Sequence, residues 1–298
     1  MKLITYEYKG TENAGVLTEN EKAVIPFSAF GLPYRSMQEF LEKSGDSERE
    51  ELKAKAANPG EAAAQAVSLE KVTMLSPIPH PAQDVICLGI NYMAHAEESA
   101  RYSNETFGGE RPYAVYFAKR VAEAVRPGGE IQGHFDITER LDYEAELAVV
   151  IGKDAKNVTE EEAPEYVFGY TILNDVSARE LQQRHKQWYF GKSLDGFTPI
   201  GPCIATRDEF AYPPALPIRS RVNGEIRQDS NTSLLIFGVS HIVSELSRGM
   251  TLKAGTIIAT GTPAGAGMGF TPPKFMKKGD VVECEIEGIG VLRNTVGD

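Results

Sequence analysis

Long apolar runs are missing from this sequence, and none approaches the roughly 20 residues that a membrane-spanning helix needs. The first residues, MKLITYEYKG, contain neither a long apolar segment nor a small-residue cleavage site, so we expect no secretory signal. Cysteine is scarce, and Cys87, Cys203 and Cys284 lie far apart, which argues against a disulfide framework or a cysteine-rich zinc site. We therefore expect a globular cytoplasmic protein with reduced thiols.

Positive charge is also in short supply. The chain has 31 Lys and Arg against 42 Asp and Glu, a formal net charge of −11. Nucleic acids and anionic membranes attract clustered positive charge, so neither is an expected partner. A small anionic substrate would need a local positive site, such as a bound metal ion. The 5 histidines are scattered and show no H-E-x-x-H or comparable zinc spacing.

The N-terminal quarter has the pattern of a small separate module without candidate chemistry. Short-strand patterns over residues 2–8 and 14–26, the latter with turn residues at Thr18 to Glu21, precede helical patterns that begin at Ser36, with a plausible capping box, and at Ser47. Closely spaced prolines after residue 76 then mark a boundary. The chain is long enough to bury a substantial core. We predict a small αβ module over residues 1–71 and a large catalytic domain over 72–298.

The stretch Leu141 to Gly152, LDYEAELAVVIG, places acidic side chains in what should otherwise be a buried strand. Alternate side chains of a strand point to opposite faces, so Glu144 and Glu146 share one face, with Cα atoms roughly 6.5–7 Å apart. The other face carries an apolar row suited to a core. Adjacent buried carboxylates repel each other and are costly to desolvate, and a divalent cation would remove that conflict. The alternative is a solvent-facing strand that carries two acids.

A histidine and a glutamate are expected on one face of a helix that follows a short strand ending at Gly89. His95 and Glu98 are separated by three positions, so the carboxylate can orient the imidazole and stabilise its cation. Such a pair can activate water. The alternative is an ordinary surface ion pair. The polar segment Arg101 to Pro112 that follows is either a mobile lid or a surface loop.

A further acid, Asp175, follows a β-branched and aromatic strand over residues 167–173. A carboxylate at the end of a core strand is well placed to converge on a site. Alternatively, Asp175 or Ser177 caps the helix that we expect to start there. On that helix Arg179 and Gln182 share a face and can address substrate oxygens.

Two later segments add candidate ligand contacts. Lys192 is expected in a loop flanked by aromatic residues, where its stem can be buried while the ammonium reaches inward. The glycine-rich segment 261–267 lacks the pattern of a phosphate loop, but its glycines permit close approach of the backbone to a ligand, and Thr262 offers a hydroxyl. Other expected elements are strands over 200–205, 218–222, 256–260 and 281–286, a hairpin turn at Asn223-Gly224, and helices starting at Thr159 and Leu234.

Taken together, several of these segments resemble the fumarylacetoacetate hydrolase family. The resemblance covers about residues 72–298, and although each motif alone is weak, the ordered set is specific. The segments are Gly89 to Glu98, DYEAEL at 142–147, NDVSAR at 174–179, GKSLD at 191–195, GTPAG at 261–265, and a closing hairpin with KGDVVE at 278–283 and EGIGVL at 287–292.

The resemblance implies an α+β fold built on a large mixed β-sheet roll, usually as a homodimer, with Mg²⁺ or Mn²⁺ in the site. The implied metal ligands are Glu144, Glu146 and Asp175, an all-oxygen set that suits a hard divalent ion. The founding hydrolases carry a further acid before the catalytic histidine, but residues 88–94 contain none. Water and substrate are therefore expected to complete the coordination, as in the shorter acylpyruvase and decarboxylase branch.

The resemblance also implies roles for other side chains. Catalytic roles fall on His95, Glu98 and Lys192, and substrate contacts on Arg179, Gln182 and Thr262. In the expected mechanism a small anionic 2-oxo acid chelates the metal through its carboxylate and 2-oxo oxygens. Bond cleavage then leaves a metal-bound enolate, which the metal and Lys192 stabilise.

The first expected reaction is hydrolysis of a C–C bond in a fumarylacetoacetate- or acylpyruvate-like 1,3-diketo acid, with His95 activating the water. Oxaloacetate decarboxylation comes second, because residues 184–187 and the fused N-terminal module resemble the branch that contains oxaloacetate-acting members. Isomerisation of 2-hydroxyhepta-2,4-diene-1,7-dioate would pass through the same kind of enolate. The remaining alternative is a catalytically silent binding member of the family. The three acids, the His95–Glu98 pair and the lysine are all intact, which argues against it.

Overall fold

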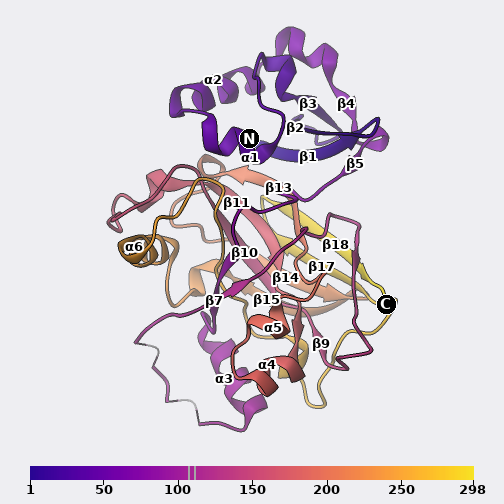
Figure 1. Cartoon of the computed structure of the whole chain (residues 1–298), viewed down its shortest axis with the longest axis vertical. Helices are drawn as coiled ribbons and strands as arrows, with labels where there is room; N and C mark the ends of the chain where they lie inside the picture. Colours follow the sequence, from indigo (N-terminus) through magenta and orange to yellow (C-terminus); the bar gives the residue numbers. More distant parts are fainter. Residues whose placement is uncertain (107, 111) are drawn as a thin grey trace.

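The computed structural model describes residues 1–106, 108–110 and 112–298, and it has the mixed α+β architecture that the family resemblance implies. The strands of its large sheet are Lys2–Tyr8 (β1), Thr11–Leu17 (β2), Ala23–Pro26 (β3), Val67–Ser68 (β4), Thr73–Met74 (β5), Val85–Gly89 (β6), Val115–Lys119 (β7), Ala145–Ile151 (β10), Val167–Asn174 (β11), Ile200–Thr206 (β13) and Ile257–Ala259 (β16). These 11 strands follow the order β4-β3-β2-β1-β13-β11-β10-β16-β6-β7, with β5 paired to β1 (Figure 1). The sheet is mixed, because β16 and β6 run parallel whereas β10 and β11 are antiparallel.

A second sheet packs against the large one. Its strands are Glu130–Ile131 (β8), Pro217–Val222 (β14), Glu225–Asn231 (β15), Val281–Ile286 (β17) and Gly290–Val296 (β18), in the order β15-β14-β17-β18-β8. Asn223 and Gly224 join β14 to β15 with φ angles of 52° and 80°, which confirms the predicted hairpin turn. A separate two-stranded pair, Leu141–Asp142 (β9) and Ser177–Ala178 (β12), lies beside the candidate site.

Strand β10 runs through the middle of the large sheet and is buried on both faces. Leu147 and Val149 belong to the core that includes residues of β14 and β17 from the second sheet. Ala148 and Val150, on the opposite face, belong to a core that includes residues of the N-terminal segment. The predicted alternation is thus confirmed. The alternative of a solvent-facing strand is wrong, because Glu144 and Glu146 are only 4% and 1% exposed.

The N-terminal strands extend the large sheet through the pairing of β1 with β13, in which Lys2 faces Ala205. Two helices accompany these strands, Met37–Lys43 (α1) and Asp46–Ala57 (α2), at one end of the molecule (Figure 1). The Ser36 hydroxyl accepts a hydrogen bond from the first turn of α1, as its capping pattern predicts. Arg49 of α2 donates to the carbonyl oxygen of Gly152 at 2.9 Å. The boundary near residue 71 stays a prediction.

Some predicted elements have different bounds. The turn predicted at Thr18 to Glu21 is confirmed, because the Glu21 amide bonds to the Thr18 carbonyl there, but the strand before it, β2, begins earlier than expected, at Thr11. The helix expected at Thr159 is only a 3-10 turn, Ala163–Tyr166 (η4). Thr159 and Glu162 do exchange hydrogen bonds between side chain and backbone, but β11 begins at once after η4, before an α-helix can extend.

The helix expected from Leu234 begins later, as Val239–Gly249 (α6). The Asn91 side chain exchanges two hydrogen bonds with the backbone of Phe237, which ties the preceding segment to another part of the chain. The remaining 3-10 turns are Phe27–Phe30 (η1), Gly60–Gln65 (η2), Leu69–Lys71 (η3), Arg207–Glu209 (η5), Thr232–Leu234 (η6) and Gly267–Gly269 (η7).

Three helices lie together at the end of the molecule away from the N-terminal strands (Figure 1). They are Met93–Ser103 (α3), Arg179–His185 (α4) and Tyr189–Lys192 (α5). Helix α3 includes the start of the predicted lid segment, and residues 107 and 111 of that segment lie outside the described residues. Among the described residues, no helix combines the length and the apolar composition that crossing a bilayer requires.

Candidate active site

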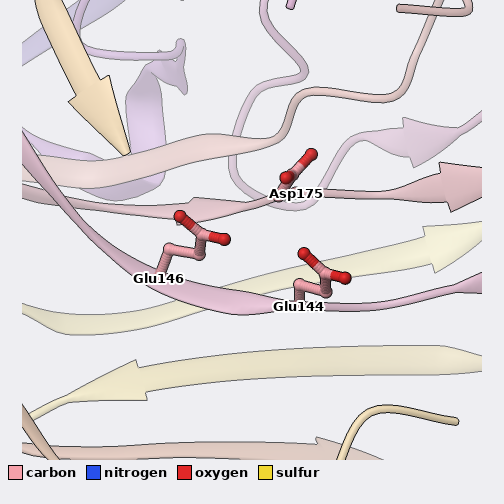
Figure 2. A group of neighbouring side chains, drawn as sticks. All are labelled: Glu144, Glu146 and Asp175. Atoms are coloured by element: carbon pink, nitrogen blue, oxygen red, sulfur yellow. The ribbon is translucent and has the colours of Figure 1, made fainter. Parts of the chain in front are cut away.

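The structure brings Glu144, Glu146 and Asp175 together in the interior. One carboxylate oxygen from each lies within 4.8 Å of the others. Asp175 directly follows β11, whose antiparallel pairing with β10 sets Ala145 opposite Asn174. The Asp175 amide also donates to the Glu144 carbonyl oxygen at 2.8 Å. Figure 2 shows the two glutamate side chains leaving the same side of one stretch of chain, with Asp175 on the segment alongside.

Side chains also hold the backbone around Glu144, which lies between β9 and β10 and directly precedes Ala145, the first residue of β10. Asn174 accepts from the Glu144 amide at 3.0 Å, and Gln228 accepts from the Ala145 amide at 3.1 Å. Thr262 donates to the Ala145 carbonyl oxygen at 2.9 Å. Because these contacts fix the backbone on both sides, the spacing of the carboxylates depends on both sheets. Sequence reasoning missed Gln228, which carries no local signal.

Two buried lysines flank Asp175. The Lys192 ammonium lies between two carboxylates, 2.7 Å from Glu144 Oε2 and 2.6 Å from Asp175 Oδ2. The Lys119 ammonium lies 2.5 Å from Asp175 Oδ1. The inward reach predicted for Lys192 is therefore present, although the residue ends helix α5 instead of lying in a loop. Sequence reasoning missed Lys119, because nothing local separates this buried lysine at a strand end from the exposed Arg120 beside it.

Arg179 contacts two carboxylates and an amide oxygen of the protein. Its guanidinium lies 2.8 Å from Asp142 and 2.7 Å from Glu144, and it donates to the Gln182 side-chain oxygen at 3.0 Å. Arg179 starts helix α4, whose start is capped by neither Asp175 nor Ser177, so the capping alternative is wrong. The helix expected from Ser177 starts two residues later because Ser177 pairs in strand β12. The geometry makes Arg179 a support for Glu144.

Backbone amides of the glycine-rich segment 261–267 donate hydrogen bonds to carboxylates of the protein, so these amides are not available to a ligand. The positive φ angles of Gly261 and Gly265, 99° and 103°, are readily adopted only by glycine. The bonds are Gly261 to Glu146 at 2.8 Å, Gly265 to Glu98 at 2.8 Å, and Gly267 to Asp142 at 2.7 Å. The segment therefore positions three acidic side chains at the site.

His95 and Glu98 form a buried pair on α3. The His95 Nδ1 atom lies 3.4 Å from Glu98 Oε2, and the residues are 4% and 8% exposed. The other Glu98 oxygen accepts from the Gly265 amide. The alternative of a surface ion pair is therefore wrong. With Nδ1 directed at Glu98, the imidazole has its Nε2 atom left for a ligand.

Most of the predicted site residues line one cavity of about 530 Å³. Phe117 and Trp188, whose ring centroids are 5.2 Å apart, supply aromatic walls. Thr262 lines the cavity too, but its hydroxyl already donates to Ala145 and accepts from Gln228 at 2.7 Å. The predicted residues on the lining are His95, Glu144, Glu146, Arg179, Gln182, Lys192 and Thr262. Asp175 and Glu98 bond to two of these lining residues, Lys192 and His95 respectively. The substrate contacts expected for Arg179, Gln182 and Thr262 stay predictions.

The carboxylates differ sharply in their electrostatic environments. Burial alone would raise the pKa of Glu144, but the adjacent Lys192 and Arg179 outweigh it and hold this pKa far below its ordinary value. Burial and then the neighbouring charges of Asp175 and Glu144 raise the pKa of Glu146 well above its ordinary value. Glu146 is thus the carboxylate whose charge the surrounding cations compensate least.

A divalent cation fits this donor set. Hard oxygen donors suit Mg²⁺ or Mn²⁺, and the site carries more carboxylates than lysine and arginine side chains. Among the described residues the acids at the site are Glu98, Asp142, Glu144, Glu146 and Asp175, and the cations are Lys119, Arg179 and Lys192. A bound divalent cation would offset this surplus of negative charge, which favours the binding of an anionic substrate.

The site has buried carboxylates, a histidine paired with a glutamate, and a lysine around one cavity. This arrangement is typical of an enzyme and is compatible with a metal ion. Residues 84–297 match the family model described as fumarylacetoacetate (FAA) hydrolase C-terminal. The chain therefore belongs to the fumarylacetoacetate hydrolase family, which confirms the prediction from its ordered motifs.

Relatives within the family have different activities. Oxaloacetate tautomerase YisK of Bacillus subtilis (strain 168) is 46% identical over 230 residues, covering 77% of this chain and 75% of that protein. The structure of fumarylacetoacetate hydrolase from psychrophilic Exiguobacterium antarcticum is 39% identical, with a TM-score of 0.82 and coverage of 100% and 99%. Maleylpyruvate hydrolase from Sphingobium sp. SYK-6, in complex with manganese(II) ion and pyruvate, is 27% identical, with a TM-score of 0.76 and coverage of 100% and 99%.

Proposed function

We propose that this protein is a divalent-metal-dependent enzyme that interconverts the keto and enol forms of a small 2-oxo dicarboxylic acid of the oxaloacetate type. The observation that carries the proposal is the under-compensated Glu146, beside Glu144 and Asp175, in a cavity that the His95 imidazole also lines. The 46% identity to an oxaloacetate tautomerase supports this choice of reaction. Sequence patterns ranked hydrolysis first and did not point to tautomerisation.

In the proposed mechanism, Glu144, Glu146 and Asp175 would hold Mg²⁺ or Mn²⁺, which would supply Lewis acidity to the 2-oxo group of the substrate. The Lys192 ammonium, which donates to the carboxylates of Glu144 and Asp175, lies beside this position and offsets negative charge that develops on the substrate. His95, oriented by Glu98, takes the proton from C3 of the keto form and returns it to the oxygen on C2. One proton moves, and no bond between carbon atoms breaks.

Hydrolysis of a C–C bond is the second candidate. The buried His95–Glu98 pair favours it, because an oriented imidazole that lines a cavity can equally deprotonate water. Similarity to fumarylacetoacetate and maleylpyruvate hydrolases supports it as well. Oxaloacetate decarboxylation and dienoate isomerisation use related chemistry and stay predictions.

The products distinguish these reactions. Metal-free protein, alone and with Mn²⁺ or Mg²⁺, should be assayed for enol–keto conversion of oxaloacetate by ultraviolet absorbance, with pyruvate release followed in parallel. Acetylpyruvate and fumarylacetoacetate should be tested for hydrolysis. We expect metal-dependent conversion of oxaloacetate that is faster than pyruvate release. Hydrolysis without tautomerisation would favour the second candidate, and no turnover of any substrate would contradict an enzymatic role.

Glu146→Ala should remove metal binding and every one of these activities together, because it deletes a proposed ligand. Normal metal affinity in that variant would exclude Glu146 as a ligand.

We also propose a homodimer, as the family resemblance implies, and sedimentation equilibrium of the purified chain tests this. A monomer with full activity would contradict the proposed dimer without affecting the metal site.

A further inference from the structure

Lys119 is a completely buried lysine with no assigned role in the proposed chemistry. It ends strand β7, which pairs with β6 in the large sheet, and its side chain is 0% exposed. The ammonium makes two contacts with one short segment of the chain. It lies 2.5 Å from Asp175 Oδ1 and donates to the Val176 carbonyl oxygen at 3.0 Å.

These contacts fix the orientation of Asp175. One ammonium holds both the side chain of Asp175 and the backbone of the next residue, so the carboxylate cannot rotate without losing a contact. The same carboxylate is bonded through Oδ2 to Lys192, and its backbone amide is bonded to Glu144. We propose that Lys119 is a positioning residue that orients Asp175 as a ligand for the divalent cation. This inference rests on the proposed metal site.

The competing explanation is that Lys119 only neutralises buried negative charge. The two explanations predict opposite results. A cation beside a metal ligand repels the metal, so if charge alone counted, removing Lys119 should tighten metal binding. If Lys119 orients Asp175, removing it should weaken binding, because groups that orient metal ligands typically contribute a factor of ~10–100 in affinity.

The test measures the affinity of metal-free protein for Mn²⁺, by calorimetry and by the electron paramagnetic resonance signal of free Mn²⁺. Lys119→Met keeps much of the side-chain volume and removes the charge and the donors. We expect its dissociation constant to rise ~10-fold or more, with native circular dichroism. Lys274→Met is the matched control, because Lys274 forms an exposed ion pair with Glu225 and should leave the affinity unchanged.

An unchanged or tighter affinity of Lys119→Met would overturn the inference. If Lys119→Met fails to fold, Lys119→Gln is the second variant, and its affinity for Mn²⁺ is judged in the same way. Loss of folding in both would also contradict the inference, because the lysine would then serve the stability of the fold and not specifically the metal ligand. Failure of the unaltered protein to bind Mn²⁺ would instead contradict the proposed function, so the two failures are distinguishable.

Discussion

The Gly261 amide donates a 2.8 Å hydrogen bond to Glu146, and among the described residues no lysine or arginine lies within ion-pair distance of that carboxylate. Glu146 therefore differs from Glu144, which contacts both Lys192 and Arg179. Neighbouring carboxylates and burial oppose its charge. The consequence is that the site without metal should hold a proton at Glu146 that the unfolded chain would release.

This difference predicts how the stability of the metal-free protein depends on pH. The pKa of Glu146 is raised in the folded state, so between its ordinary value near 4.5 and that raised value the folded chain binds more protons than the unfolded one. Stability should therefore fall as pH rises through this range, and the Glu146→Gln variant should lose this contribution. Thermal melting of both proteins from pH 4.5 upward tests this. An equal pH dependence in the two proteins would show that Glu146 does not retain the proton.

His95→Ala should reduce tautomerisation and hydrolysis ~10²- to 10⁴-fold, since a general base normally contributes that much. Metal affinity should stay unchanged, because His95 bonds to Glu98 and is not among the clustered acids. His241→Ala is the control, since His241 is 38% exposed and contacts Glu160. A loss of less than about tenfold would exclude His95 as the base. Retained decarboxylation would be compatible, because that reaction needs no water attack.

Asp142→Asn should destabilise the protein by ~1.5–3 kcal/mol, because it removes the charge of a 0% exposed carboxylate that bonds to the buried Arg179 guanidinium, which keeps only Glu144 as a charged partner. It also weakens the hydrogen bond to the Gly267 amide. Asp229→Asn breaks an exposed pair with Arg219 and should cost no more than ~1 kcal/mol. Urea denaturation measures both. Similar small losses would mean that Asp142 contributes little beyond an ordinary surface ion pair.

Gly265→Ala should be more destabilising than Gly10→Ala, although both glycines have positive φ angles, 103° and 74°. A Cβ at Gly265 would lie 2.0 Å from the Arg227 carbonyl oxygen, whereas a Cβ at Gly10 meets no atom within 4 Å. We expect about 1 kcal/mol for Gly10→Ala from backbone strain and a further ~1–3 kcal/mol at Gly265 from overpacking. Equal melting temperatures would contradict the close approach at Gly265.

Local patterns in the sequence predicted the parts of the site that depend on neighbours along the chain. The two-residue period of a strand put Glu144 and Glu146 on one face, and the apolar row on the other face of β10 is confirmed. The helical spacing of His95 and Glu98 likewise predicted their contact. Less reliable were element starts, such as that of α6, because contacts from distant residues override local preference.

What only the tertiary structure decided is how the acids are compensated. The hydrogen-bond partners at the site lie far away in the sequence. Lys119 is 56 residues from Asp175, and Gly267 is 125 residues from Asp142. Gln228, which bonds to the Ala145 amide, is 83 residues from it. No local pattern indicates such pairs, because a buried charge is stabilised by whichever group the fold brings within hydrogen-bond distance. The sequence by itself determined which carboxylates face the site. The fold determined that, of Glu144, Glu146 and Asp175, only Glu146 has no lysine or arginine of the described residues at ion-pair distance.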